Sequence, residues 1–490
     1  MFLEIALFAS VACLVHWIQW RGFFSGQKHP PSFYGFPLVG ILPFFLFHKN
    51  QVKLARTTAM KYGPVFRFRL GNTETIMVNG SETVKEALRN DDLLGRPPIG
   101  PFKLLANLFK AQPFSMLECE RWRSLRNWSV QALRELGFGK TPQMEGKIQD
   151  EVSVFLDELS STKGAPYDPN STLLASVSNN ISTLIFGDRL PYDHPRRRSL
   201  NDFLKKVASS ASYLTLFSFA PSLLKIFTIF KIKSVENFVN AAKATSEIFD
   251  EEFRAHEKTY IETDKRDLMD HSIAHLRANS ELLSEQTTRG SCLAFFGAGS
   301  NTARITVEYL LQLLAYYPQL QEQMHQEVIR EIGYSRLPSW SDHGKLHLLN
   351  AFIAERMRIF PIVPFGLFRR ALRDTKIRGY DVAKGSMVIY NVASAHFDPT
   401  VFENPEEFNP GRFLDADGNF VQSPDVLSFA IGKRACPGET FAVFEIFLYA
   451  AAIIQRFRIE PAQGQDVRLT EATEFFSEAI PQQLRFISRV

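Results

Sequence analysis

The stretch "FAIGKRACPGE", residues Phe429 to Glu439, runs directly into an apolar helical pattern. Pro437 pre-sets the first turn of a helix because its ring fixes the backbone angle φ. Cys436 therefore precedes a helix N-terminus, where free N–H groups stabilise a thiolate. A cysteine at such a junction is either a buried structural thiol or a thiolate that binds a metal ion.

The other residues of the stretch favour a metal held in a flat ring. Gly432 and Gly438 let the backbone come close to a planar partner. Phe429 can pack on an aromatic face, and Arg434 offers a fork of donors to a carboxylate. An iron porphyrin needs these parts: a sulfur ligand, an apolar contact and a cation for one propionate.

The pattern F-x-x-G-x-R-x-C-x-G resembles the haem-binding loop of the cytochrome P450 superfamily, the thiolate-haem monooxygenases. Its five fixed residues coincide by chance in on the order of one chain in ten thousand. The resemblance implies a mainly α fold with small β-sheets, formed as one large helical domain. It also implies haem b as the cofactor, with Cys436 as the ligand of its iron.

Two further motifs extend the resemblance. "AERMR" contains Glu355-x-x-Arg358, and "FNPGRF" places Arg412 ahead of the cysteine. In the family, these three residues form a buried ionic cluster that locks the haem-side core. A half-complete buried cluster is costly, so all three residues should be present together, as they are.

A third group of residues matches positions that face the haem propionates. "GRPP" at 95–98 and "ERWRSLRNW" at 120–128 are similar to the microsomal branch of the family. The resemblance assigns Trp122 and Arg126 to one propionate, and the spacing from Arg358 assigns Arg369 to the other.

The stretch "FFGAGSNTARITVEYL" matches the family's oxygen-activating groove. The resemblance implies that the small residues Ala298 and Gly299 let a helix pass close over the haem and that its hydrogen bonding loosens locally. Thr302 would hydrogen-bond oxygen and relay protons through water, although back-bonding to the preceding turn is common for threonine in helices. Asn301 replaces the usual acid, and an amide can orient a water but cannot take up a proton. A dinucleotide fingerprint starting at Gly297 is disfavoured because its third glycine is missing.

Composition excludes several classes of protein. The 490 residues are 45% hydrophobic and include 44 phenylalanines, which favours an interior that also encloses something apolar. The net charge of +4 gives no reason to expect a nucleic-acid partner, and the triplet at 196–198 is typical of a solvated loop. The four cysteines are too far apart for a disulfide framework or a zinc site, which favours a reducing compartment.

The N-terminus predicts a membrane anchor. Residues 1–20 are mostly apolar, and the positive charges follow them, which places the downstream body in the cytosol. A signal peptide and a buried helix are the alternatives. Residues 21–40 contain Pro30, Pro31 and Pro37 and predict a stiff hinge, followed by the catalytic domain at 41–490. The resemblance implies attachment to the endoplasmic reticulum membrane.

Helical patterns dominate the body. Examples lie at 82–90, 143–160, 170–186, 235–258, 281–317 and 439–457. Strand patterns are short: "VFRFRL" with "TIMVN", and "KIRGYDV" with "SMVIYN". The apolar stretch 213–232 is interpreted either as a buried helix pair or as a hinge that dips into the membrane.

The resemblance implies a monooxygenase that oxidises a lipophile such as a steroid, a fatty acid or a xenobiotic. Electrons would come from NADPH-cytochrome P450 reductase, with cytochrome b5 as a second candidate partner, because no flavin or nicotinamide domain is recognisable. Arg121, Arg123 and Lys433 could steer an acidic electron donor or could be plain solvated charge. Two alternatives stay open: a reductase-independent isomerase, supported by Asn301 alone, and a non-catalytic membrane haem protein.

Overall fold

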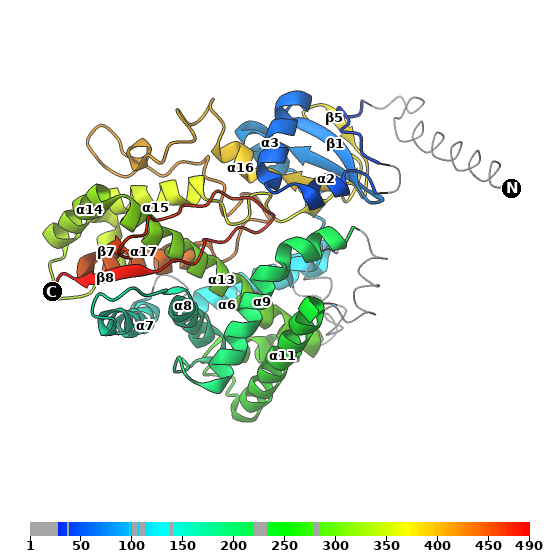
Figure 1. Ribbon diagram of the computed structural model, residues 1–490. Coiled ribbons are helices and arrows are strands. Elements are labelled where there is room, and N and C mark those ends of the chain that lie inside the picture. Colours follow the sequence, from blue (N-terminus) through cyan, green and yellow to red (C-terminus); the bar gives the residue numbers. More distant parts are fainter. Residues whose placement is uncertain are drawn as a thin grey trace, which may run out of the picture.

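The computed structural model describes residues 28–36, 39–97, 99, 106, 114–137, 141–219, 233–278 and 284–490. Helices form most of this structure, and a small sheet lies at one side of it (Figure 1). The predicted fold class, mainly α with small β-sheets, is confirmed.

The predicted helices are all present with small shifts at their ends. They correspond to α4 (Ser81–Arg89), α7 (Pro142–Ser161), α8 (Asn170–Phe186), α11 (Lys233–Thr259), α13 (Glu285–Tyr316) and α17 (Glu439–Arg456). The further helices of the described residues are α2 (Leu42–Phe47), α3 (Gln51–Tyr62), α6 (Cys119–Glu135), α9 (Pro195–Phe217), α12 (Leu268–Ala278), α14 (Pro318–Glu331), α15 (His347–Ile359) and α16 (Val392–His396). Short 3-10 turns are η1 (Asp91–Leu93), η2 (Phe114–Met116), η3 (Trp340–Lys345) and η4 (Pro410–Phe413).

The strand patterns "VFRFRL", "TIMVN" and "SMVIYN" each form a strand, and "KIRGYDV" contributes to two, whereas the strands at 369–370, 457–461 and 484–488 were not predicted. The main sheet has the order β1-β2-β6-β3, formed by β1 (Val65–Leu70), β2 (Thr73–Val78), β6 (Met387–Tyr390) and β3 (Arg369–Arg370). The β2–β6 pair is parallel and joins segments about three hundred residues apart, whereas β1–β2 and β3–β6 are antiparallel. Two hairpins complete the set: β4 (Thr375–Ile377) with β5 (Tyr380–Val382), and β7 (Phe457–Pro461) with β8 (Leu484–Ser488).

Helix α13 lies at the centre of the helical part (Figure 1). The Ser284 side chain caps its N-terminus by accepting the Thr287 N–H at 3.2 Å. From Ala303 to Ala315 every residue is buried, since the helix packs against α8, α17, α15 and β7. A helix that is buried all round is a core element. This buried half of α13 supports the region bordered by the partly exposed residues before Ala303.

Helix α17 begins directly after the cysteine loop and is apolar over most of its length. Its one buried acid, Glu445, accepts a hydrogen bond from Asn180 Nδ2 of α8 at 2.6 Å. The Tyr449 hydroxyl continues this contact to Asn180 at 3.1 Å and to the Ser176 hydroxyl at 2.6 Å. The helix that carries the cysteine at its N-terminus is thus joined to α8 by a buried polar network.

The described part of the proline-rich hinge is fixed to the main sheet. Phe33 N–H donates to the Arg67 carbonyl at 2.8 Å, and Ile41 N–H donates to the Arg69 carbonyl at 2.8 Å. Residues 28–36 therefore dock on β1 rather than forming a free spacer. The predicted anchor at 1–20 lies outside the described residues, and no helix within the described ranges is long and apolar enough to cross a bilayer.

The arginine triplet at 196–198 is not a solvated loop, so that interpretation was wrong. It lies in the first turn of α9, and Arg197 is completely buried. Its guanidinium donates to the Ser178 hydroxyl at 2.8 Å and to the Ser182 hydroxyl at 3.2 Å. The apolar stretch 213–232 is described only to Phe219, and its central part lies outside the described residues.

Candidate haem site

The cysteine loop is shaped by two residues in the left-handed region. Ala430 has φ +56° and Gly432 has φ +78°, and the Cys436 N–H closes the loop on the Phe429 carbonyl at 2.9 Å. A Cβ on Gly432 would lie 2.8 Å from the Leu88 carbonyl oxygen at the end of α4. Glycine is therefore required for its conformation and for its contact with α4, whereas the sequence had suggested contact with a flat ligand.

The Cys436 thiol is accessible to solvent although protein surrounds it. Burial raises its pKa, while the N–H groups of Gly438 and Glu439 and the guanidinium of Arg126 oppose this rise. The two amides belong to the N-terminal turn of α17, as the sequence predicts. Their direction towards the sulfur suits a thiolate, and a coordinating metal deprotonates a thiol outright.

Four guanidinium groups gather beside the cysteine loop. Three were predicted (Arg126, Arg369 and Arg434), and the fourth is Arg96. Burial, followed by the charges of Arg369 and Arg126, lowers the pKa of Arg434 to about 9. Burial followed by the charges of Arg369 and Arg434 holds the pKa of Arg96 well below its usual range. Arg369 and Arg434 are buried, and Arg96 and Arg126 are partly buried. Their charges repel each other, so the site is complementary to an anionic ligand.

Each cation is held by backbone carbonyl groups, which leaves other N–H donors for a ligand. Arg126 Nη2 donates to the Ala435 carbonyl at 2.8 Å, and Arg369 Nη1 donates to the Leu88 carbonyl at 3.1 Å. Arg434 lies over the ring of Trp122, with its Cζ 3.8 Å from the ring centroid. Trp122 is buried in α6, so it forms part of the same wall.

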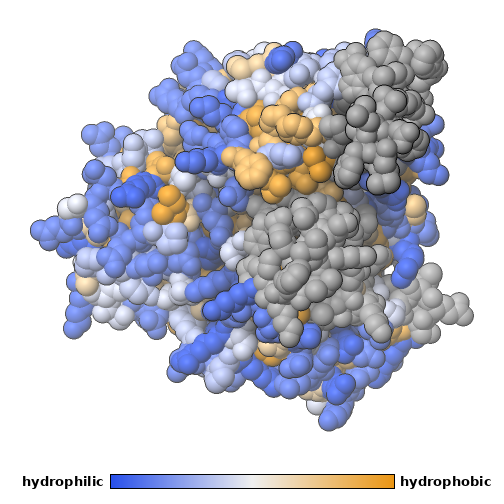
Figure 2. Space-filling model, turned by 45° about the vertical axis from the view of Figure 1, so that its right-hand side comes forward, coloured by the Kyte–Doolittle hydropathy of each residue, from blue (hydrophilic) through white to orange (hydrophobic). Residues whose placement is uncertain are grey.

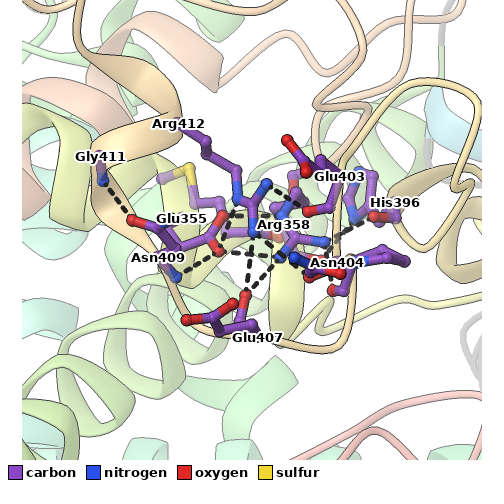
Figure 3. Close-up of polar contacts among 12 residues, drawn as sticks. Glu355, Arg358, His396, Glu403, Asn404, Glu407, Asn409, Gly411 and Arg412 are labelled. Carbon is purple, nitrogen blue, oxygen red and sulfur yellow. Dashed lines mark hydrogen bonds and ion pairs between the residues drawn. The ribbon is translucent and has the colours of Figure 1, made fainter.

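The predicted ionic cluster is present (Figure 3). Glu355 is fully buried and accepts Arg358 Nε at 2.7 Å and Arg358 Nη2 at 2.8 Å. Arg412 Nε reaches the same carboxylate at 3.0 Å, and the Asn409 N–H reaches it at 2.8 Å. Arg358 also donates to the carbonyl groups of His396 at 2.7 Å and Pro405 at 2.8 Å, which anchors the loop 396–412 on α15.

His396 connects this cluster to the cysteine loop. Burial, followed by the charge of Arg358, lowers its pKa to about 3, so its imidazole is neutral at physiological pH. Nδ1–H donates to the Arg358 carbonyl at 2.8 Å, and Nε2 accepts the Leu427 N–H at 2.8 Å. The Ser428 hydroxyl also donates to the Met357 carbonyl at 2.9 Å. The segment just before Phe429 is thus bound to α15 by two side chains.

On α13, Ala298 is exposed although Phe296 and Ser300 are buried, so this face borders open space. The Thr302 hydroxyl donates to the Ala298 carbonyl at 2.8 Å, which is the back-bonded alternative. Phe295 lies about one turn before Ala298 and stacks on Phe114 with ring centroids 4.8 Å apart. Because Phe114 belongs to the cluster around Trp122, the face of Ala298 adjoins the wall that carries Arg434.

Two predictions for the α13 groove are corrected by the structure. A Cβ on Gly299 would lie 2.7 Å from Ile181 Cδ1, so this glycine serves the packing of α13 on α8. Asn301 is buried, and its Nδ2 donates to the Leu204 carbonyl of α9 at 2.9 Å, so this amide is directed at α9. The helix is continuous through these residues, and the expected local loosening is absent.

Comparison with known proteins agrees with this geometry. The family model of cytochrome P450 matches residues 30–486. The chain belongs to the cytochrome P450 family. It is 30% identical to cytochrome P450 2C23 of Rattus norvegicus over 475 residues, 94% of this chain and 93% of that protein. It is 31% identical to cytochrome P450 2A12 of Mus musculus over 490 residues, 98% of this chain and 97% of that protein.

The chain is therefore a cytochrome P450 monooxygenase, and its cofactor is haem b bound through a cysteine thiolate. The residues around Cys436 fit this group. They combine an accessible sulfur at a helix N-terminus with four grouped guanidinium groups, none of which forms an ion pair with a carboxylate among the described residues. The Arg96 Nε atom is buried and has no partner within the described ranges. Two propionates would supply the missing negative charge.

Arg96 is the residue of this P450 site that the sequence analysis did not single out. "GRPP" was noted as a family match without a role. Arg96 Nη1 donates to the Leu367 carbonyl at 2.6 Å and to the Phe368 carbonyl at 2.7 Å, which brings it beside Arg369. In the sequence, Arg96 is marked by its position between a glycine and two prolines. The carbonyl groups that its guanidinium contacts lie about 270 residues further along the chain.

Proposed function

We propose that this P450 is a membrane-attached monooxygenase that inserts one oxygen atom of O2 into an apolar substrate, with Cys436 as the haem ligand. The observation that carries the proposal is the Cys436 sulfur, which lies at the N-terminus of α17 beside four guanidinium groups. Haem bound there supplies the redox chemistry, and thiolate ligation favours O–O cleavage.

The protein's own residues would hold the haem in four ways. Cys436 would bind the metal, and Phe429, partly buried at the start of the loop, would pack against the ring. Gly438 leaves space, since a Cβ there would meet no atom closer than the Cys436 sulfur at 3.8 Å. The donors for the two propionates are the cations and the indole of the wall described above, namely Arg96, Arg126, Arg369, Arg434 and Trp122.

On the opposite side, Thr302 would hold and relay a proton. Its hydroxyl donates to the Ala298 carbonyl, so its lone pairs can accept a hydrogen bond from a water on the open face of α13. Ala298 leaves room there because it carries only a methyl group. Asn301 would act through packing on α9, and Gly299 would act through packing on α8.

The electron donor would be NADPH-cytochrome P450 reductase, with cytochrome b5 as a second partner. The basic face suggested for it is partly neutralised, since Arg123 pairs with Glu120 at 3.1 Å and Lys433 pairs with Asp91. These pairs are exposed, and exposed ion pairs are weak enough to open for a competing acidic surface. Arg121, also exposed, would add to this face.

An apolar surface area supports membrane attachment at the endoplasmic reticulum. Two phenylalanines of α2 are exposed, Phe47 to 85% and Phe44 to 41%. Phe36, which precedes α2 in the chain, is 57% exposed. Phe36 and Phe44 stack with ring centroids 5.8 Å apart, so the exposed rings are contiguous. Figure 2 shows apolar side chains gathered on this face of the molecule. Exposed apolar patches of this kind mark membrane or protein contact sites, and a position at the membrane suits a lipophilic substrate.

The test is reconstitution with reductase, NADPH and a panel of steroids, fatty acids and xenobiotics. We expect at least one product that carries one oxygen atom from O2, formed only when reductase and NADPH are present. Turnover of a lipid hydroperoxide without either of them would instead establish the isomerase. Because Asn301 bonds to α9, the sequence argument for that alternative loses its basis.

A pair of threonine variants tests the oxygen side. We expect Thr302→Ala to lower the product formed per NADPH consumed by about tenfold or more, with hydrogen peroxide released instead, because the hydroxyl that would hold the proton-relaying water is lost. Thr306→Ala is the matched control, since its hydroxyl makes the same bond one turn further on, to the Thr302 carbonyl at 2.8 Å, from a buried position. Equal coupling in the two variants would remove Thr302 from the proton path.

A further inference from the structure

Glu118 occupies an unusual position directly before α6. It stands at the N-cap with φ −128° and ψ 166°, but its side chain does not cap the helix. Its carboxylate instead turns to two other chain segments. Oε1 accepts the Arg96 N–H at 2.6 Å and Arg370 Nε at 3.3 Å, and Oε2 pairs with Arg370 Nη2. The two partners are Arg96 of the propionate wall and the residue next to Arg369.

Gly95 allows the carboxylate to come this close. Gly95 and Arg370 form a bridge in which Gly95 N–H donates at 3.1 Å and Arg370 N–H donates back at 2.9 Å. A Cβ on Gly95 would lie 2.6 Å from the Arg370 carbonyl oxygen and 3.0 Å from Glu118 Oε1. A larger residue at position 95 would displace the Glu118 carboxylate or the Gly95–Arg370 bridge. The position of the Glu118 carboxylate therefore depends on Gly95.

The residues that flank this contact orient two cations of the wall. Arg434 Nε donates to the Leu94 carbonyl at 3.0 Å, and Arg434 Nη2 donates to the Leu117 carbonyl at 2.6 Å. Leu94 directly precedes Gly95, and Leu117 directly precedes Glu118. A shift of the carboxylate would therefore move the carbonyl groups that aim the Arg434 guanidinium.

Charge adds to this geometric role. The groups that act on Arg434 are Arg369 and Arg126, which repel it, and Glu118 and Cys119, which attract it. Arg96 is repelled by Arg369, Arg434 and Arg126. Among the described residues, Glu118 is thus the carboxylate whose charge offsets the repulsion of Arg434 by Arg369 and Arg126.

We propose that Glu118 is the positioning residue of the propionate wall. It fixes the segments that carry Arg96, Arg369 and Arg434 relative to one another, and so it controls haem retention and the reduction potential of the bound iron. This inference rests on the proposed haem site and adds to it a residue that does not itself contact the ligand.

The test compares Glu118→Gln with Glu118→Asp and with Glu120→Gln. Glu120 lies two residues further on in the first turn of α6 and is 79% exposed, so it is the matched control. The amide introduced by Glu118→Gln would direct donors at the Arg370 guanidinium, whereas Glu118→Asp keeps the charge. The first readout is the rate at which the ferric protein loses haem to excess apomyoglobin. The second is the midpoint potential measured by spectroelectrochemistry.

We expect Glu118→Gln to lose haem about tenfold faster than wild type, a difference of about 1.4 kcal/mol. We also expect its midpoint potential to shift to more positive values, because a negative charge near the ring has been removed. Glu118→Asp should recover most of the potential, and Glu120→Gln should match wild type in both readouts. If Glu118 only stabilised the fold, its variants would lose haem faster, and the midpoint potential of Glu118→Asp would not return towards the wild-type value.

Equal rates and potentials for Glu118→Gln and Glu120→Gln would overturn the inference. If Glu118→Gln does not fold, the haem-loss rate of Glu118→Asp decides, because the shorter side chain cannot keep both the Arg96 N–H and the Arg370 contact and should lose haem faster than Glu120→Gln. Equal haem-loss rates for these two variants would then overturn the inference. Failure of the proposed function is distinguishable, since the wild-type protein would then lack the spectrum of thiolate-bound haem altogether.

Discussion

Replacing Arg358 with methionine is expected to lower the free energy of unfolding by about 3–5 kcal/mol. The change leaves the fully buried Glu355 carboxylate with Arg412 and the Asn409 N–H as its remaining partners among the described residues. It also leaves the carbonyl groups of His396, Pro405 and Glu407 without their Arg358 donors. Removing one partner of a buried ion pair costs more than replacing the whole pair by apolar residues, because the other charge stays buried with fewer partners. This loss is a large part of the total stability of a typical domain, about 5–15 kcal/mol.

The measurement is thermal unfolding followed by circular dichroism, together with the yield of soluble haem-containing protein. Arg330→Met is the control, since Arg330 is exposed and pairs with Glu331 at 2.9 Å on the surface. We expect the control to stay within about 0.5 kcal/mol of wild type. An Arg358→Met protein with the wild-type unfolding midpoint and haem content would show that the cluster does not stabilise the haem-side core.

Replacing Glu445 with glutamine is expected to stabilise the protein at pH 8 and to change little at pH 5. Burial raises the pKa of Glu445 to about 8, despite the hydrogen bond from Asn180. Between the ordinary pKa of about 4.5 and this value, the unfolded chain releases a proton that the folded chain retains. Stability therefore falls as pH rises through this window, at up to about 1.4 kcal/mol per pH unit. Glutamine keeps the acceptor for Asn180 and cannot ionise.

The measurement is the thermal midpoint of both proteins from pH 5 to pH 8. We expect the wild-type midpoint to fall more steeply than that of Glu445→Gln, so that the difference is largest at pH 8. Glu158→Gln, on the exposed face of α7, should follow the wild-type curve. A Glu445→Gln protein that is less stable than wild type at pH 8 would mean that the carboxylate is ionised and well solvated in the fold.

The sequence was most informative where chemistry depends on short spacing. The cysteine loop could be predicted because its residues are close neighbours in the chain. The spacing of Glu355 and Arg358 is common on surface helices, so their buried pairing could be predicted only through the family resemblance. The spacing of hydrophobic residues likewise located α13 and α17 to within a few residues. Arg412 could be added only through the family resemblance, since its partner lies 57 residues away.

The sequence was least informative about the directions of side chains on α13. Ala298 to Thr302 span little more than one turn, so neighbouring residues face different elements. Gly299 and Asn301 meet α8 and α9, which cannot be known without the tertiary structure. Arg96 was missed for a related reason, because its role depends on carbonyl groups of residues 367 and 368.

The most direct test of the haem site is the spectrum of the reduced protein with carbon monoxide. We expect the wild-type protein to show the red-shifted Soret band of thiolate-bound haem, and Cys436→Ala to lose it. Cys119→Ala is the matched control, since Cys119 is the other cysteine within the described residues that is exposed, and it should keep the band. A Cys436→Ala protein that binds haem with the unchanged wild-type spectrum would contradict the assignment of Cys436 as the ligand.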